Sequence, residues 1–463
     1  MVTTLVVISD LHLADGSATF ENWGADQQAT FEALLGATRG NGALASDTVE
    51  LIINGDCFDF LLTPPHLGAR DSTDVNIAHA KWVNIMAAHG PWFTALREFL
   101  RAPGHRVTFI IGNHDMELAF PSVRARVRSA IGAAPGMVRF CLTQAYQPLP
   151  DVLIDHGCQF DAYNAIPVLW RQQPSISTPS ALETSDARGQ PVGPLALPWG
   201  SRYFYRAFVP AKRRLRYLDE CIPALGSVRQ AALLCVLAPD LLLEMLPQLA
   251  TLLPAEAAAP TMPSADLVDQ PAALFMATML LSQQLLQGVP ASGGDDANSM
   301  AEVSQLYAAL EQGRYEALRA ALSIWPDLGI HHTDAAELAA ARDVLAQTEG
   351  LRYVILGHTH EEGRWSVGTN LAILNTGTWV ARKALPHSAD FTPEYSAWAT
   401  EPGTLPYPGR DGRRFIAAWL RSEPGAATVG ELIEWSIPTQ NEAATANSTP
   451  PFIRVPDDAM ERW

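Results

Sequence analysis

Residues 5–12 read Leu-Val-Val-Ile-Ser-Asp-Leu-His, a run of aliphatic residues that ends in a carboxylate and an imidazole. Short aliphatic and β-branched runs of this kind predict buried strands. The same arrangement, an apolar run followed by chemically active polar residues, recurs at several places further along the chain. Loops beyond the carboxyl ends of strands in an α/β sheet converge on one crevice, so we expect these polar residues to lie together.

Five short motifs follow predicted strands. They are Asp10-Leu11-His12 after Leu5–Ser9, Gly55-Asp56-Cys57-Phe58-Asp59 after Val49–Asn54, Gly112-Asn113-His114-Asp115 after Val107–Ile111, His156-Gly157 after Val152–Asp155, and Gly357-His358-Thr359-His360 after Tyr353–Leu356. Any one of them alone is weak evidence, because Asp-x-His and Gly-Asp occur often by accident. All five in order at strand ends indicate one functional site.

The residue types in these motifs fit a metal site. Asp, His and Asn offer an anionic oxygen, an imidazole nitrogen and a neutral carbonyl, a set suited to Mn²⁺, Fe or Zn²⁺. In Asp-x-His and His-x-His, the two-residue spacing can direct both side chains the same way from an extended segment. The glycines permit sharp turns and close approach of the ligands.

The ordered motif set resembles that of the calcineurin-like metallophosphoesterase superfamily, over residues 1–164 and 350–380. The resemblance implies an α/β fold, a β-sandwich of two mixed sheets flanked by helices. It also implies two divalent metal ions, with Mn²⁺ favoured and Fe or Zn²⁺ as alternatives. By this resemblance, metal one is held by Asp10, His12, Asp56 and His360. Metal two is held by Asp56, Asn113, His156 and His358, with Asp56 bridging.

The resemblance further implies a metal-dependent phosphoesterase. The two cations would share a water, lower its pKa and present a bridging hydroxide for in-line attack on phosphorus. Asp59 matches the family's second acidic position, where a carboxylate would fix the tautomer of a ligating histidine. His114 is not needed for coordination. We assign it as proton donor to the leaving oxygen or as transition-state stabiliser, with Asp115 orienting its ring.

Strand and helix patterns alternate early and return late in the chain, which predicts one α/β domain interrupted by an insertion. Amphipathic segments near Gln27–Thr38 and Ala78–Leu100 predict helices, and Leu371–Leu374 and Glu431–Ile437 predict further strands. The middle is Ala/Leu-rich with helical spacing. The predicted division is 1–164 and 346–438 for the two parts of the core, 165–345 for a mostly α-helical insertion or cap, and 439–463 for a loosely held C-terminal tail.

Composition narrows the class of protein. Hydrophobic residues make up 48% of the chain and charged residues 17%, which excludes a disordered or coiled-coil protein. The net charge of −17 disfavours non-specific binding of nucleic acid. The five cysteines form no CxxC pattern and indicate free thiols in a reducing compartment, with Cys57 and Cys158 as small apolar residues beside the site. With no basic leader before residue 10, we expect a cytoplasmic protein.

One basic cluster stands out in this acidic chain, within residues 202–216. Its cations are Arg202, Arg206, Lys212, Arg213, Arg214 and Arg216, interleaved with aromatic residues. One interpretation is a substrate phosphate clamp formed by Arg202, Arg206, Arg213 and Arg214. The other is a solvated helix face. The apolar stretches Leu233–Leu253 and Ala273–Leu286 fit a helical core or subunit interface better than contact with lipid, and a homo-oligomer stays open.

Three functions stay open. The first is a dinuclear metal phosphoesterase that hydrolyses a phosphodiester, phosphomonoester or pyrophosphate of a small molecule. A lipid-linked substrate is an alternative, because residues 9–13 and 54–60 are similar to those of UDP-diacylglucosamine pyrophosphohydrolases. That family typically has Arg where this chain has His114. The second is a nuclease, since double-strand-break repair nucleases share Asp-x-His-Leu and Gly-Asn-His-Asp, although the charge counts against it. The third is a metal-poor binding scaffold, which would usually have lost ligands that this chain retains.

Overall fold

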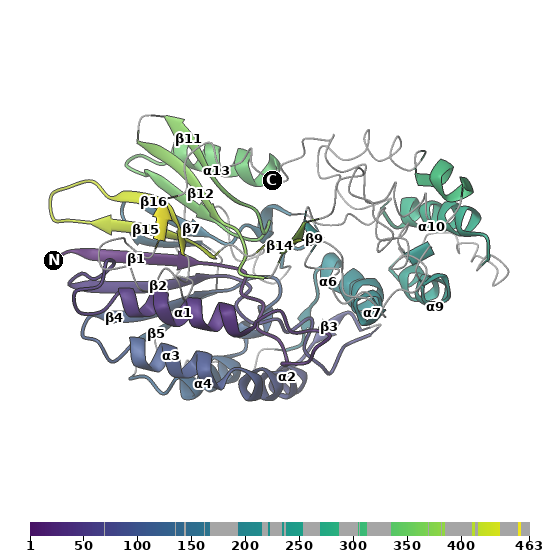
Figure 1. Ribbon diagram of the computed structural model, residues 1–463, viewed down its shortest axis with the longest axis horizontal. Helices are drawn as coiled ribbons and strands as arrows, with labels where there is room; N and C mark the ends of the chain where they lie inside the picture. The colour runs from purple at the N-terminus through teal and green to yellow at the C-terminus, as the bar shows by residue number, and fades with distance from the viewer. Residues whose placement is uncertain are drawn as a thin grey trace.

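The structure is a computed structural model of the chain. It describes residues 1–68, 70–134, 136–142, 145–161, 163–166, 193–214, 221–222, 234–235, 238–252, 269–286, 304, 306–312, 335–368, 370–380, 382–384, 410–412, 415–435 and 452–454. The strands gather in one half of the molecule, and the helices of the middle of the chain lie beyond the ends of the strands (Figure 1).

The larger sheet contains seven strands in the described part of the chain, in the order β17-β16-β15-β1-β2-β4-β5. They are β1 (Thr3–Ile8), β2 (Thr48–Asn54), β4 (His105–Ile110), β5 (Val138–Cys141), β15 (Phe415–Ser422), β16 (Val429–Trp435) and β17 (Phe452–Arg454). Strands β1, β2, β4 and β5 are parallel, whereas β15, β16 and β17 pair antiparallel. The four parallel strands therefore present their carboxyl ends at one edge.

The second sheet has the order β11-β12-β10-β7-β6. Its strands are β6 (Ala145–Leu149), β7 (Val152–Asp155), β10 (Tyr353–Leu356), β11 (Glu362–Gly368) and β12 (Leu371–Thr376). The central strands β7, β10 and β12 are parallel, and β6 and β11 pair antiparallel at the edges. This sheet is also mixed.

Alternation along β1 shows how the two sheets pack. Successive side chains of a strand point to opposite faces. Leu5 and Val7 belong to the apolar cluster that also contains Ile154 and Ile355 of the second sheet. Val6 and Ile8 belong to the cluster under the helices on the opposite face. Strand β1 thus contributes side chains both to the core between the sheets and to the core beneath the helices.

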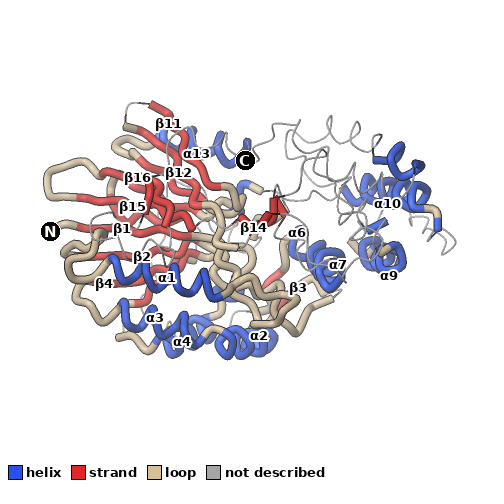
Figure 2. The backbone as a smooth tube through the Cα atoms, in the orientation of Figure 1, coloured by secondary structure: helices blue, strands red, loops and turns tan. Residues whose placement is uncertain are grey.

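Helices cover the outer faces (Figure 2). Helices α1 (Ala25–Ala37), α2 (Val75–Ala88), α3 (Gly90–Phe99) and α4 (Pro121–Ile131) lie on the large sheet, and α13 (Ala335–Gln347) packs Ala341 and Leu345 on the second sheet. The predicted fold class, two mixed sheets flanked by helices, is confirmed. The amphipathic segment near Ala78–Leu100 is helical as predicted, but it forms two helices that meet at His89. Helix α3 begins at Gly90, and Pro91 in its first turn has no N–H with which to continue α2.

Between β7 and α13 the described residues are mainly helical. They form η2 (Cys158–Phe160), α6 (Trp199–Tyr203), η3 (Phe204–Phe208), α7 (Val209–Arg214), α9 (Pro239–Ala250) and α10 (Pro271–Leu286). Short strands add small sheets: β3 (Ser72–Thr73) with β8 (Leu195–Ala196), and β9 (Cys221–Ile222) with β13 (Arg382–Ala384) and β14 (Arg410–Gly412). None of the helices in the described residues has the length and hydropathy needed to cross a bilayer.

The division of the chain at residues 165, 345 and 439 stays a prediction. Within the predicted tail, Phe452–Arg454 form β17, which pairs with β16 through Ile433 and Trp435. This part of the tail is therefore a strand of the large sheet, and not the loosely held segment that its polar, proline-rich surroundings indicated.

Candidate metal centre

The strand-end motifs converge at one place. Asp10 and His12 follow β1 and Asp56 follows β2 in the large sheet, whereas His156 follows β7 and His358 follows β10 in the second sheet. The sheets pack face to face, so the carboxyl ends of their parallel strands lie near each other. Motifs separated by hundreds of positions thereby meet at one end of the sandwich.

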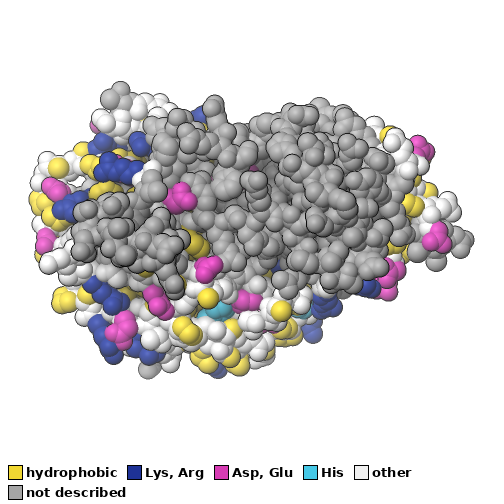
Figure 3. Space-filling view, viewed as in Figure 1, with side chains coloured by type: hydrophobic (Ala, Val, Ile, Leu, Met, Phe, Trp, Pro, Cys, Tyr) yellow, Lys and Arg dark blue, Asp and Glu magenta, His cyan; other side chains and the backbone are white. Residues whose placement is uncertain are grey.

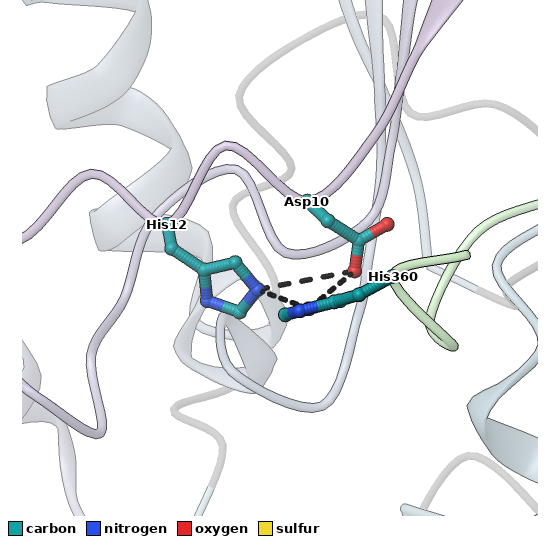
Figure 4. A group of neighbouring side chains, drawn as sticks. All are labelled: Asp10, His12 and His360. Atoms are coloured by element: carbon teal, nitrogen blue, oxygen red, sulfur yellow. Dashed lines mark hydrogen bonds and ion pairs between the residues drawn. The ribbon is translucent and has the colours of Figure 1, made fainter. Parts of the chain in front are cut away.

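A first group of donors consists of Asp10, His12 and His360 (Figure 4). Nε2 of His12 lies 2.9 Å from Nε2 of His360. Oδ1 of Asp10 lies 3.4 Å from Nε2 of His360 and 3.9 Å from Nε2 of His12. The donor atoms are all within 4.8 Å of one another, as ligands of one cation would be. The residues lie in the segments that follow β1 and β10, which are the central strands of the two sheets.

A second group of donors consists of Asp56, His156 and His358, again with all donor atoms within 4.8 Å of one another. Nε2 of His156 lies 3.4 Å from Oδ2 of Asp56, and Nδ1 of His156 donates to the backbone oxygen of Asn54 at 2.8 Å. That hydrogen bond fixes the proton on Nδ1 and leaves Nε2 for a cation. Nε2 of His358 lies 3.3 Å from Oδ2 of Asp161.

Unsatisfied polar atoms support a cation site. Among the described residues, Oδ1 of Asp10, Oδ1 of Asn113 and Nε2 of His156 are buried and make no hydrogen bond. Each belongs to a residue expected to bind metal, and a buried polar atom without a partner costs about 1–3 kcal/mol. A cation held by Asp10 would satisfy the first of these atoms and a cation held by Asn113 and His156 the other two, so the donor set fits two such ions.

The charges of the ionisable groups at the site also support a cation site. Burial raises the pKa of Asp56, but the imidazoles of His156 and His114 outweigh burial and hold that pKa well below its ordinary value. Burial lowers the pKa of His156, yet the carboxylates of Asp56 and Asp10 raise it to about 10. The carboxylates therefore stay ionised and create a negative potential that favours a cation.

Asp59 links two histidines. Its Oδ2 accepts hydrogen bonds from Nδ1 of His12 at 2.9 Å and from Nδ1 of His114 at 3.0 Å. Burial raises the pKa of Asp59, but His114 and His12 lower it far more, so the carboxylate is ionised and can only accept. Both Nδ1 atoms then carry the proton, and Nε2 of each ring is available to a cation or a substrate. His114 also forms a group of possible ligands with His12 and Asp56.

The prediction that Asp115 orients the His114 ring is wrong. Oδ1 of Asp115 accepts from the N–H of Gly112 at 2.6 Å, and Oδ2 accepts from the N–H of Cys57 at 2.9 Å. Side chains of adjacent residues diverge, so Asp115 points into the protein when His114 points to the site. Burial, and then the charge of Asp56, raise the pKa of Asp115 to about 7. Asp115 ties the loop after β4 to the loop after β2.

Backbone strain is concentrated at the expected ligands. Positive φ angles occur at Asp10 (54°), His12 (50°), Asp56 (49°), His358 (68°) and His360 (61°). Non-glycine residues rarely adopt this region, and such strain clusters at functional sites. The extended geometry predicted for Asp-x-His and His-x-His is therefore wrong: left-handed turns, and not alternation along a strand, direct these side chains to one place.

Two glycines make room for the ligands. A Cβ on Gly55 would lie 2.2 Å from Nδ1 of His156, and a Cβ on Gly112 would lie 2.1 Å from Oδ1 of Asp56. No other residue fits at either position without moving a ligand. Gly55 also has a φ of +79°, which disfavours a side chain for a second reason.

Two acidic residues near His358 were not predicted from the sequence. Asp161 faces Nε2 of His358, and its charge raises the pKa of that ring. Glu337 of α13 is fully buried, and its carboxyl carbon lies 3.2 Å from where a Cβ of Gly157 would be. Its charge also raises the pKa of His358. A search for carboxylates shortly after His156 would have found Asp161, but no motif marks Glu337.

Three arginines of the basic cluster face a carboxylate, and Arg213 faces a histidine. Arg206 is buried with Nη2 at 2.8 Å from Oδ1 of Asp71, and Nη1 of Arg202 lies 3.9 Å from the same atom. Nη2 of Arg214 lies 3.3 Å from Oδ2 of Asp240, and Nη2 of Arg213 lies 3.3 Å from Nδ1 of His66. Arg216 lies outside the described residues. The phosphate clamp stays a prediction, and its weakest member is the buried Arg206.

Cys57 and Cys158 lie beside the site as buried residues. Burial raises the pKa of both thiols well above the ordinary value, and the charge of Asp56 adds to the effect. The thiolate is the form that binds metals, so neither side chain is favoured as a ligand.

Comparisons with known proteins relate part of the chain to a family. Residues 3–175 match the family model of the calcineurin-like phosphoesterases. A search of curated proteins returns no match. Among solved structures, a dimetal phosphatase from Danio rerio aligns at 12% identity over 92% of this chain and 98% of that chain. Its TM-score of 0.27 is too low to support a conclusion. The match of residues 3–175 to this family, a part of the chain that includes four of the five strand-end motifs, supports a metal-dependent phosphoester hydrolase.

Proposed function

We propose that the protein hydrolyses a phosphate ester or anhydride of a small molecule at a centre of two divalent cations, with Mn²⁺ favoured. The observation that carries the proposal is the pair of donor groups at the strand ends, Asp10 with His12 and His360, and Asp56 with His156 and His358. When bound, two cations supply Lewis acidity toward a water and toward the phosphoryl oxygens.

The residues divide between two positions. Asp10, His12 and His360 would hold the first cation, and His156, His358 and the amide oxygen of Asn113 would hold the second. Asp56 would bridge the two positions, because its carboxylate lies in a group of donors with His156 and His358 and in another with His12. The hydrogen bonds from Nδ1 of His12 to Asp59 and from Nδ1 of His156 to Asn54 would hold the ligand rings in place.

His114 is proposed to protonate the leaving oxygen. Its Nδ1–H donates to Asp59, which leaves Nε2 as the atom that can carry a proton to a substrate. The side chain keeps 16% exposure, whereas Asp10, Asp56 and His156 are buried. A side chain that is partly exposed in this way can reach a leaving oxygen without being a cation ligand.

The experiment uses two chromogenic substrates. Chelator-stripped protein is assayed with bis-p-nitrophenyl phosphate and with p-nitrophenyl phosphate, before and after Mn²⁺ is restored. We expect Mn²⁺-dependent release of p-nitrophenol from at least one of them, and loss of turnover in His114→Ala with the metal content unchanged. No hydrolysis of either substrate by protein that has bound Mn²⁺ would contradict the proposal.

A nuclease is the less favoured enzyme. On the face shown in Figure 3, the described Lys and Arg side chains are interspersed with Asp and Glu, and the chain has a net charge of −17. A nuclease needs a basic surface that follows the phosphate backbone. A lipid-linked pyrophosphate such as UDP-diacylglucosamine stays a candidate substrate, with His114 where that family typically has Arg.

A further inference from the structure

The helical run α6–η3–α7 packs beside the metal centre. Its middle part, Phe204–Phe208, is a π-helical turn between two α-helical segments. The ring of Phe204 meets the ring of His114 edge to face, with 5.3 Å between centroids and 82° between planes. Turns of this type are uncommon and occur frequently at functional sites.

We propose that Phe204 is a positioning residue: its ring fixes the orientation of the His114 imidazole. The proposal rests on the role that the proposed function gives to His114. It assigns a task to one of the aromatic residues that are interleaved with the cations of residues 202–216.

The contacts of His114 show why a further support is needed. One hydrogen bond, from Nδ1 to Asp59, fixes one atom of the ring but leaves the ring free to swing about that atom. The ring of His12 contacts it edge to face at 4.6 Å and 89°. Phe204 adds a second edge-to-face contact, a geometry that aromatic rings favour. Together the three contacts define the direction of Nε2.

The π turn is itself anchored to the core. Tyr205 is buried, and its hydroxyl lies 2.6 Å from Nζ of Lys81 in α2. Arg206 is buried, and its Nη2 donates to Asp71 at 2.8 Å. These two residues follow Phe204 directly in the chain, so their anchors hold the position of its ring.

The anchor also reaches the loop that carries His114. Nζ of Lys81 donates to the backbone oxygen of Phe60. The N–H of Phe60 in turn donates to the backbone oxygen of His114 at 3.0 Å. Phe204 and His114 are thus attached to the same support.

Phe208 stacks on Phe204, with 4.4 Å between centroids and 20° between planes. This stack limits movement of the Phe204 ring. Loss of the Phe204 ring would let the imidazole swing and misplace Nε2. A misplacement of this kind lowers the rate of the chemical step more than it lowers the binding of substrate.

The experiment compares four single variants of the Mn²⁺-loaded full-length protein with p-nitrophenyl esters. Phe204→Leu and Phe204→Met are expected to lower kcat by about tenfold with KM within about twofold. Phe204→Tyr keeps the ring and is expected to retain most of kcat. Trp199→Leu is the matched control: Trp199 is a half-buried aromatic residue of the same helical run that stacks on Tyr203, and kcat should stay unchanged.

A double-mutant cycle separates positioning from general structural damage. In a His114→Ala background, Phe204→Leu is expected to cause no further loss of kcat, because the ring that it positions is absent. A kcat for Phe204→Leu and Phe204→Met equal to that of the wild type overturns the inference. So does a loss of the same size in Phe204→Tyr, or a loss that persists in full without His114.

The same variants distinguish failure of the proposed function from failure of the inference about Phe204. If His114→Ala keeps full turnover, the role of His114 fails, and the inference about Phe204 falls with it. If His114→Ala loses turnover but Phe204→Leu does not, the inference fails and the proposed function stands. Metal content and melting temperature, measured for every variant, show that each compared protein is folded and loaded.

Discussion

Nε2 of His12 and Nε2 of His360 lie 2.9 Å apart, although 348 positions separate the two residues in the chain. Oδ1 of Asp10 is 3.4 Å from Nε2 of His360 and 3.9 Å from Nε2 of His12, so three donor atoms from two sheets surround one point. The proposed occupant of that point is a divalent cation. The contact exists because β1 and β10 end side by side in facing sheets.

Removal of His360 should release one cation. We expect His360→Ala to bind about one equivalent of Mn²⁺ in place of two, and to lose phosphoesterase activity by at least about 10²-fold. His79→Ala is the matched control, since His79 contacts Ser122 on the helical face and no donor group. Metal analysis by mass spectrometry after desalting gives both values. Two equivalents in His360→Ala would remove this residue from the ligand set.

A methyl group at Gly55 should disturb the second cation. The added Cβ of Gly55→Ala would lie 2.2 Å from Nδ1 of His156, in a backbone conformation that alanine disfavours. We expect loss of one equivalent of metal and of activity. Gly36→Ala in α1 is the control: nothing lies within 4 Å of its Cβ, and it should raise stability by about 0.5–1 kcal/mol. A fully active, fully loaded Gly55→Ala would show that His156 need not hold its position.

Replacement of Asp59 by Asn tests the link between two rings. The amide can donate toward Nδ1, so it no longer forces the proton of His12 and His114 onto that atom. We expect Mn²⁺ affinity to fall by about 10–100-fold and kcat to fall further at saturating metal, because both a ligand ring and the proton donor lose their orientation. Calorimetric titration and steady-state kinetics measure the two effects. If saturating Mn²⁺ restores full kcat, Asp59 does not act on His114.

Much of the site was predictable because its chemistry is encoded locally. The residues that follow β1, β2, β4, β7 and β10 could be chosen from aliphatic runs followed by Asp, Asn or His. The role of Asp115 could not be derived, because it depends on which way a side chain leaves a loop. Glu337 and Phe204 also could not be found: each comes close to the site through packing between elements, and no sequence pattern records that packing.

The fold was predictable to a similar depth. Strand runs such as Tyr353–Leu356 are buried on both sides, so their apolar composition marks them clearly. The division between α2 and α3 at His89 was missed because the apolar periodicity continues across it, and Pro91 was the available signal. The strand at Phe452–Arg454 was missed because a three-residue edge strand has too short a pattern to detect.

The lowered pKa of Lys81 predicts that the free energy of unfolding depends on pH. Burial lowers its pKa from 10.5 to about 8, although the charges of Glu117 and Asp59 oppose the shift, and Tyr205 is its neutral neighbour. Between these pKa values the unfolded chain binds more protons than the folded protein, so stability rises with pH. The wild type should gain roughly 3 kcal/mol relative to Lys81→Met between about pH 7.5 and 10.5. Urea unfolding across that range measures the difference, and a constant difference would contradict the shifted pKa.

Metal stoichiometry tests the central claim most directly. Chelator-stripped wild-type protein and Asp56→Asn are titrated with Mn²⁺, and each step is assayed with bis-p-nitrophenyl phosphate and p-nitrophenyl phosphate. The account predicts two equivalents bound by the wild type, hydrolysis that appears as the second site fills, and fewer than two equivalents with no hydrolysis in Asp56→Asn. A wild-type protein that binds no Mn²⁺, or that hydrolyses both substrates equally well without any metal, would contradict it.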